Sequence, residues 1–267
     1  MATTNSNSAA LPHSFASYLY RRSQLGNKYS SGRLLVDAGS NQFPGAALLA
    51  VGGARRGGAG YINYLSRAEL PTHLLLQAFP DVVPITDPGE INFDAVLVGP
   101  GSPAITELPK AARVIIDGGA LTFVKNPPPN DQIWVLTPHE GEIKRMGFDP
   151  RDREECAITA ARALRAVILL KGFNSIVATP DRIVHIDHIA GPELSTAGTG
   201  DVLAGLIASM IASHKPESLD MAATITAHAA EILAVSARSS LRKRAPLVAT
   251  DLLDEIPMLL AQGETSL

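Results

Sequence analysis

The chain has 267 residues, of which 46% are hydrophobic and 18% charged, and its formal net charge is −3 at pH 7. These values exclude a strongly basic nucleic-acid-binding face, and no segment has the ~20 continuous apolar residues of a membrane span. The charge and hydropathy therefore predict no nucleic-acid or membrane partner. The single cysteine, Cys156, excludes an internal disulfide, so we expect a cytoplasmic protein.

The first 27 residues predict a disordered tail. Their opening stretch is rich in Ser, Thr, Asn and Ala and lacks the basic region and apolar core of a signal peptide. After this tail, short apolar runs predict strands at Arg33–Val36, Tyr61–Leu65, Ala95–Val98, Arg113–Ile116, Ile133–Leu136 and Val167–Leu170. Most of these runs are continuous, which is typical of strands covered on both faces.

Helical patterns lie between and after these strands. The spacing of apolar residues predicts helices at Ala46–Ala54, Asp152–Leu164 and Leu219–Ala237. The alternation of strand and helix predicts an α/β fold with a mainly parallel central sheet and helices on both faces. Ser175–Thr179 and Arg182–Ile186 predict an antiparallel edge hairpin. No linker divides residues 28–267, so we expect them to form one domain.

A glycine-rich turn with the sequence Ala-Gly-Thr-Gly, residues 197–200, leads directly into an apolar helix. Its amides, together with the unpaired amides at a helix start, form a site for an anion such as phosphate. Asp201 follows at once, although a carboxylate repels phosphate. A carboxylate at this place can instead accept a proton from a hydroxyl that attacks phosphorus, so Asp201 is a candidate general base.

Four other distinctive turns follow predicted strands, and they begin at Gly99, Asp117, Thr137 and Lys171. Ligands of parallel sheets gather at the carboxyl ends of the strands, so we expect the five turns to line one cleft. Each turn also has a purely structural interpretation. Gly99-Pro100-Gly101 is by itself a common tight turn, Asp117 is a possible helix cap, and Lys171 is a possible solvated lysine.

Two further patterns have structural interpretations. Thr137-Pro138-His139-Glu140 predicts a helix start, with Thr137 as the N-cap and Pro138 as the first helical residue, whether or not His139 also contacts a ligand. The close pair His185 and His188 is interpreted as surface residues of a strand and a turn, because no third metal ligand lies nearby in sequence.

The order and the residues of these motifs resemble those of the NAD(P)H-hydrate dehydratases of the ribokinase-like superfamily. The resemblance covers residues 28–267. It depends on Gly99-Pro100-Gly101, on Leu136-Thr137-Pro138-His139-Glu140-Gly141-Glu142, on Leu170-Lys171-Gly172 and on Ser195 through Gly205. The Gly-Thr-Gly-Asp turn alone indicates only the superfamily, whereas the Thr-Pro-His-Glu-Gly-Glu run points to the dehydratase branch. Gly119 departs from the family, because a second acid is common at this place.

The resemblance implies roles for particular residues. Asp201, Gly200 and Gly198 would be catalytic. The substrate-binding set would be Ala46, Gly99, Gly101, His139 and Asp201, and the nucleotide-binding set would be Lys171, Gly172, Phe173, Asn174, Ser175, Thr199 and Gly200. Glu142 would contact a hydrated Mg²⁺ ion through its water shell.

The resemblance also implies a reaction. ADP or ATP would phosphorylate the C6 hydroxyl of a hydrated NADH or NADPH (NADHX or NADPHX, as the 6S epimer), and loss of phosphate would restore the dihydronicotinamide. This activity repairs damaged cofactor. A homo-oligomer, such as a tetramer, is expected, and a separate epimerase would be the pathway partner, since no room for one exists ahead of Lys28.

Two other functions fit the same motifs. One is a ribokinase-like kinase for a sugar, thiazole or pyridoxal-type alcohol, which would release a stable phosphate ester. The other is a nucleotide-binding relative that has lost its activity. The acid at Asp201 argues against the second, because a binding module gains nothing from a carboxylate held against phosphate.

Overall fold

The computed structural model describes residues 25–102 and 111–264. Its strands form one nine-stranded sheet in the order β3-β2-β1-β4-β5-β6-β7-β8-β9. The strands are β1 (Arg33–Asp37), β2 (Tyr61–Leu65), β3 (Val83–Ile85), β4 (Ala95–Val98), β5 (Arg113–Ile116), β6 (Ile133–Leu136), β7 (Val167–Leu170), β8 (Ile176–Ala178) and β9 (Ile183–Ile186). Strands β1 to β7 are parallel, and β8 and β9 add an antiparallel edge. The predicted fold class is confirmed.

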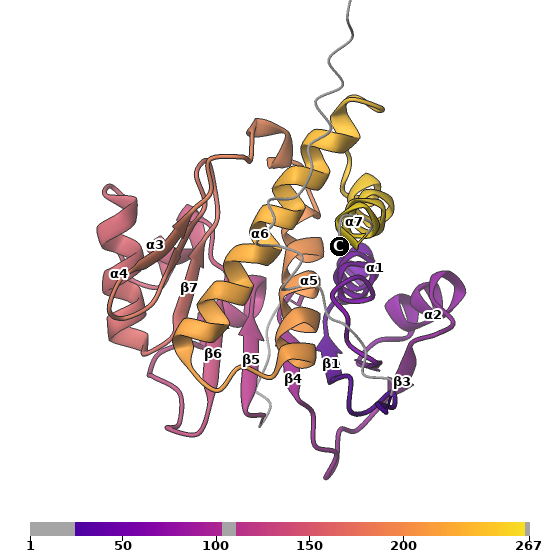
Figure 1. The fold of residues 1–267 in the computed structure, drawn as a ribbon. Helices are drawn as coiled ribbons and strands as arrows, with labels where there is room; N and C mark the ends of the chain where they lie inside the picture. Colours follow the sequence, from indigo (N-terminus) through magenta and orange to yellow (C-terminus); the bar gives the residue numbers. More distant parts are fainter. Residues whose placement is uncertain (1–24, 103–110, 265–267) are drawn as a thin grey trace, which may run out of the picture.

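Helices cover both faces of this sheet. They are α1 (Pro44–Ala54), α2 (Glu69–Ala78), α3 (Glu140–Arg145), α4 (Arg153–Leu164), α5 (Thr199–His214), α6 (Leu219–Leu241) and α7 (Ala249–Glu264), with short 3₁₀ turns η2 (Gly118–Phe123) and η3 (Pro192–Leu194). Figure 1 looks onto α5 and α6, with α3 and α4 at one end of the sheet and α2 and β3 at the other.

The continuous apolar strands are explained by these two layers. In β5, Ile115 packs in the core formed with α1, α5, α6 and α7, whereas Val114 and Ile116 pack in the core formed with η2, α3 and α4. Both sets of side chains are fully buried. A strand between two helical layers needs apolar side chains on both faces, so alternation is lost.

Helices α1 and α5 approach each other unusually closely. A Cβ atom added to Gly53 of α1 would lie 2.2 Å from the carbonyl oxygen of Val202, and one added to Gly205 of α5 would lie 1.8 Å from that of Ala50. Only glycine allows two backbones to meet at such distances. The crossing joins the start of α5 firmly to α1.

The predicted strands and helices are all present, with shifts of one to four residues at some ends. Asp152 is the N-cap of α4 rather than its first residue, since its carboxylate accepts the Glu155 N–H at 3.1 Å. Helices α2 and α7 and strand β3 were not predicted. Most of the predicted tail, residues 1–24, lies outside the described residues.

Candidate active site

The start of α5 carries the glycine-rich turn. Gly198 is its N-cap with φ +92°, and a Cβ there would lie 2.4 Å from Leu49 Cδ1 of α1, so only glycine fits. The Thr199 hydroxyl donates to the carbonyl oxygens of Leu194 and Thr196 at 2.7 and 2.9 Å, which fixes the turn. No side chain caps the helix start within the described residues. Its amides and dipole therefore offer a site for an anion.

One of the predicted anion-binding amides is already used. The Thr199 N–H donates to Thr196 O at 3.3 Å, so it is not free for a ligand. The helix dipole still favours negative charge at this end, and Asp201 lies in its first turn.

Lys171 lies at the end of β7, beside the start of α5. Its ammonium nitrogen donates to Asp117 Oδ1 at 2.6 Å, and a Cβ built on Gly200 would lie 3.4 Å from the same nitrogen. Thr137 also donates to Asp117 Oδ1 at 2.6 Å. Asp117 occupies the N-cap position of η2, but its carboxylate does not cap that turn. It orients Lys171 toward the anion site instead.

Burial and two nearby carboxylates raise the proton affinity of Asp201. Burial, the nearby Asp117 carboxylate and Glu142 raise the pKa of Asp201 to about 7, although Lys171 acts in the opposite direction. Burial acts to lower the pKa of Lys171, but Asp117, Glu142 and Asp201 outweigh it, so this pKa is raised. A carboxyl group that titrates near neutral pH is matched to general-base catalysis.

The predicted cap of the helix after β6 was wrong by two residues. His139, not Thr137, is the N-cap of α3, and its Nδ1 accepts the N–H groups of Gly141 and Glu142 at 2.9 and 3.2 Å. Glu142 completes a capping box, because its Oε2 accepts the His139 N–H at 2.8 Å. The Thr137 hydroxyl is instead committed to Asp117, which excludes it as the cap.

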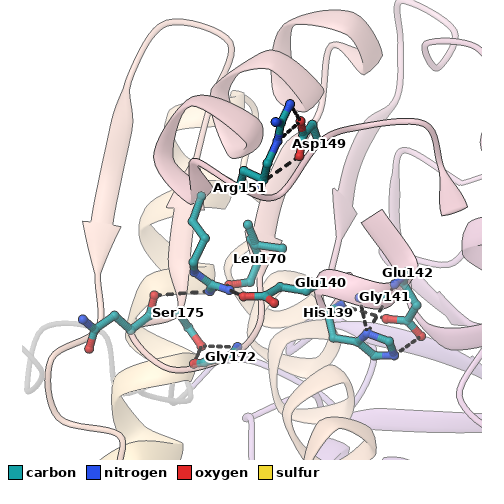
Figure 2. A network of polar contacts seen from close by, with 11 residues as sticks. His139, Glu140, Gly141, Glu142, Asp149, Arg151, Leu170, Gly172 and Ser175 are labelled. Atoms are coloured by element: carbon teal, nitrogen blue, oxygen red, sulfur yellow. Dashed lines mark hydrogen bonds and ion pairs between the residues drawn. The ribbon is translucent and has the colours of Figure 1, made fainter. Parts of the chain in front are cut away.

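His139 is also joined to β7 through its backbone. It pairs with Lys171 in an isolated parallel bridge, and the Lys171 N–H donates to Pro138 O at 2.8 Å. Figure 2 shows the His139 ring turned toward Glu142, whose Oε1 lies 3.5 Å from Nε2. Nδ1 is therefore occupied by the cap of α3, and Nε2 faces the Glu142 carboxylate.

The turn after β4 lies between α1 and Asp117. Gly99 has φ +114°, and a Cβ there would lie 1.9 Å from the Asp117 carbonyl oxygen. A Cβ on Gly101, at φ +63°, would lie 2.3 Å from Ala46 Cβ. The predicted substrate-side residues Ala46, Gly99 and Gly101 thus belong to one packed region that reaches the Lys171 site through Asp117.

A pocket of about 180 Å³ adjoins the start of α5. Its walls come from Lys171, Gly172, Phe173, Ser175, Ala190, Gly191, Pro192, Leu194, Ser195, Thr199, Gly200, Leu203 and Leu233. Six of the seven predicted nucleotide-binding residues line it. Asn174 is not among the lining residues, and its backbone carbonyl oxygen accepts a hydrogen bond from Arg153. Phe173 is 75% exposed and offers an aromatic ring beside the pocket.

The donor set does not form a metal site by itself. In residues 25–102 and 111–264, no group of three His, Cys, Asp or Glu side chains is placed to hold an ion. Asp117 is engaged with Lys171, and Glu142 is engaged with the α3 cap. These residues fit a hydrated ion carried by nucleotide phosphates, rather than a dehydrated ion bound by the protein.

The histidine pair lies at and after β9, with His185 in the strand and His188 beyond it, but the exposure of His185 differs from the prediction. His188 is exposed, but His185 is half-buried against α6, with Nδ1 3.4 Å from Glu231 Oε1. Burial lowers the pKa of His185. Describing His185 as a surface residue was therefore wrong, because α6 covers this part of the edge hairpin.

Comparison with known families gives this geometry a context. A family model described as NAD(P)H-hydrate dehydratase matches residues 34–258, which include the whole sheet except the first residue of β1, and the start of α5. The chain belongs to the NAD(P)H-hydrate dehydratase family. The resemblance predicted from the motifs is therefore confirmed.

Individual relatives agree with this family. The chain is 34% identical to the bifunctional NAD(P)H-hydrate repair enzyme Nnr of Gloeobacter violaceus, over 72% of its own length and 42% of that protein. It spans less than half of the length of several such bifunctional relatives. It is 32% identical to the ADP-dependent (S)-NAD(P)H-hydrate dehydratase of Bacillus subtilis, over 74% of its own length and 78% of that protein.

Solved structures give the same fold. The ADP/ATP-dependent NAD(P)H-hydrate dehydratase of Bacillus subtilis, co-crystallised with ATP and Mg²⁺, matches with a TM-score of 0.83 at 28% identity, over 97% of this chain and 99% of that one. A ribokinase-like superfamily protein from Enterococcus faecalis matches with a TM-score of 0.80 at 19% identity, over 95% of each chain. The fold of this family member is ribokinase-like.

No helix in the described parts of this family member has the length and hydropathy needed to cross a bilayer. Sequence reasoning placed the Asp117 turn in the cleft but missed its contact with Lys171, and it missed Arg153 altogether. Asp117 orients Lys171, and Arg153 reaches the turn that follows β7. The only sequence signal for Asp117 was its position directly after a buried strand.

Proposed function

We propose that this chain catalyses the nucleotide-dependent dehydration of hydrated NADH and NADPH. The observation that carries the proposal is Asp201, whose pKa is raised to about 7 in the first turn of α5, beside the Lys171 ammonium. This arrangement combines a base with an anion site, which phosphoryl transfer to an alcohol requires. The family and its named relatives supply the substrate class.

In the first step, Asp201 takes the proton of the C6 hydroxyl as its oxygen attacks the terminal phosphoryl group of ADP or ATP. General-base assistance of this kind contributes on the order of 10²–10⁴ in rate. Gly200 leaves room for the phosphoryl group beside the Lys171 ammonium, and Gly198 lets the turn pack against α1 at the helix start. Lys171, oriented by Asp117, offsets the charge that develops on the phosphoryl oxygens.

In the second step, phosphate leaves from C6 as the lone pair of the ring nitrogen forms a double bond, and a proton is lost from the neighbouring C5. Hydroxide is a poor leaving group at neutral pH, and phosphate is a much better one. The nucleotide therefore supplies the phosphoryl group that turns the hydroxyl into a good leaving group. The products are the dihydronicotinamide, the nucleotide shortened by one phosphate, and phosphate.

The nucleotide is proposed to lie along residues 171–175, with its base in the pocket beside Phe173 and its phosphates toward Thr199 and Gly200. The hydrated nicotinamide ring is proposed to lie between Asp201 and the region of Ala46, Gly99, Gly101 and His139. A bound Mg²⁺ ion would neutralise phosphate charge, and Glu142 is its proposed partner through water.

The test is a matrix of ADP and ATP against hydrated NADH and NADPH. Recovery of the dihydronicotinamide absorbance with at least one pair is the expected result. A stable phosphate ester formed without recovery would identify a kinase instead, and neither product with any pair would refute the proposal. The matrix also determines which nucleotide and which hydrate are preferred.

We further propose that the enzyme acts in the cytoplasm as a homo-oligomer and that an epimerase is its pathway partner. The single cysteine supports the location, and the bifunctional names of the longer relatives are consistent with a second activity in the same repair process. The single continuous sheet supports the proposal that residues 28–267 form one domain. Size-exclusion chromatography with light scattering tests the oligomeric state.

A further inference from the structure

The turn that joins β7 to β8, residues 171–175, holds conformations that are unfavourable for most residues. Gly172 has φ +143°, and Asn174, which is not glycine, has φ +54°. Within the turn, the Ser175 hydroxyl donates to Gly172 O at 3.1 Å. Four residues of this turn line the pocket beside α5. A turn with such dihedrals keeps its shape only when its surroundings fix it.

Arg153 contacts this turn from the start of α4. It is the first residue of α4, and its side chain is only 21% exposed. One terminal nitrogen, Nη2, donates to the carbonyl oxygens of Leu170 and Asn174 at 3.2 and 3.5 Å. These two carbonyls bracket the turn, one before Lys171 and one before Ser175. A single guanidinium group therefore holds both ends of the turn.

The other terminal nitrogen of Arg153 reaches α3. Nη1 donates to Glu140 Oε1, and Glu140 is the first residue of α3, directly after the His139 cap. Figure 2 shows Glu140, Leu170 and Gly172 close together, between Ser175 on one side and His139 on the other. The guanidinium thus connects the turn along the pocket with the helix that bears His139 and Glu142.

Gly172 adds a packing argument. A Cβ built on Gly172 would lie 3.0 Å from Arg153 Nη1 and 3.2 Å from Nη2, so the turn rests directly on the guanidinium. A planar group with donors in fixed directions can support a backbone and bind a carboxylate at once. A lysine offers one ammonium on a flexible stem and cannot reproduce the three contacts.

We propose that Arg153 is a positioning residue for the nucleotide, a role that rests on the proposed function of the pocket. It fixes residues 172–175 and so places this wall of the pocket before the nucleotide arrives, whereas the Lys171 ammonium is held separately by Asp117. Arg153 does not contact the reacting atoms. Its loss should weaken nucleotide binding and leave the chemical step at saturating nucleotide nearly unchanged.

A purely structural role makes a different prediction. If Arg153 only ties α4 to the sheet, its replacement lowers the stability of the fold, and nucleotide binding by the folded fraction stays the same. Arg151 provides a matched control. It is also an arginine paired with a carboxylate, that of Asp149, but its side chain is 90% exposed and the pair lies away from the turn (Figure 2).

The experiment compares Arg153→Met, Arg153→Lys and Glu140→Gln with Arg151→Met. Nucleotide affinity is measured by calorimetry with ADP and ATP, and KM and kcat are measured with hydrated NADH as the second substrate. For Arg153→Met we expect an increase in KM and Kd on the order of 10-fold, the effect of losing hydrogen bonds from a charged group. We expect kcat within about 2-fold and an unchanged pH midpoint of kcat, because Asp201 is untouched.

Arg153→Lys should recover only part of the affinity, and Glu140→Gln should weaken it by a smaller factor than Arg153→Met. Hydrogen exchange of the amides of residues 172–175 should accelerate in the Arg153 variants and stay unchanged in Arg151→Met. If Arg153→Met does not fold, Arg153→Lys and Glu140→Gln carry the same comparison. Glu140 is 56% exposed, so its replacement creates no cavity.

Equal nucleotide affinity in the wild type and all three variants overturns the role of Arg153 while leaving the proposed function intact. A wild-type protein that binds neither ADP nor ATP overturns the proposed function itself, and the inference about Arg153 with it. An Arg151→Met variant that loses affinity as strongly as Arg153→Met also overturns the specific assignment.

Discussion

Replacing Asp201 with Asn should stabilise the protein and abolish its activity. The pKa of Asp201 is raised to about 7 in the folded state, whereas an exposed aspartate titrates at about 3.9. The folded protein therefore retains a proton that the unfolded chain releases between these values. The stabilising contribution of this group is complete below pH ~3.9 and is lost as the pH rises through about 7. Asn carries no charge, so the variant is free of this loss.

The magnitude follows from the difference between the two pKa values. A difference of about 3 units corresponds to about 4 kcal/mol, and each pH unit in that window contributes about 1.4 kcal/mol. Between pH 5 and pH 7, the stability advantage of Asp201→Asn should therefore grow by about 2–3 kcal/mol. Above pH ~7.5 the advantage should stay constant.

Urea denaturation of both proteins at half-unit steps from pH 5 to pH 8.5 measures this curve. Asp131→Asn is the control. Asp131 is exposed at the amino end of β6, whereas the candidate site lies at the carboxyl ends of the strands, so its replacement should leave the curve unchanged. A constant difference between wild type and Asp201→Asn across the range would refute the raised pKa. The wild-type kcat should rise with pH through about 7, and the kcat of Asp201→Asn should be lower by a factor of about 10²–10⁴.

Three other variants test the site and its support. Lys171→Met should lower kcat/KM by about 10²–10³ and shift the pH midpoint upward, since Lys171 lowers the pKa of Asp201; an unshifted pH–rate profile would contradict the coupling. Gly205→Ala should destabilise the fold by about 1–3 kcal/mol, because the new Cβ meets the Ala50 carbonyl oxygen. Thermal unfolding measures this loss, and a variant as stable as the wild type would refute the close contact. His139→Ala should cost about 1 kcal/mol by removing the cap of α3; denaturant unfolding that matches the wild type would show that the cap contributes nothing.

The elements that sequence reasoning missed are those in which local signals are weak. Strand β3 has only three residues, includes Pro84 and lies at the edge of the sheet, so it resembles a loop in sequence. Helix α7 contains Pro257, which normally argues against a helix interior. The short buried strands and helix α5 were predictable, because the two packed layers require continuous apolar runs, which are uncommon in loops.

The candidate site was predictable where the chemistry is local in sequence. Gly198, Gly200 and Asp201 lie within four consecutive residues at the start of α5, and the roles proposed for them follow from backbone freedom and charge. The link from Asp117 to Lys171 joins residues 54 positions apart, so only the parallel order of β5, β6 and β7 brings them together. The cap at His139 was misplaced for a similar reason, since Thr137 had a tertiary partner that its neighbours in sequence do not reveal.

The glycines at the crossing of α1 and α5 have a consequence for ligand design. Main-chain atoms of the two helices touch there, so neither helix can slide, and Leu49 of α1 is held against Gly198 at the mouth of the site. A phosphate mimic would thus meet a receptor whose shape exists before it arrives, and little ordering entropy would oppose its capture. An inhibitor series would therefore be better varied in the groups that face residues 171–175, because hydrogen bonds rather than contacts between helix backbones hold that side of the pocket.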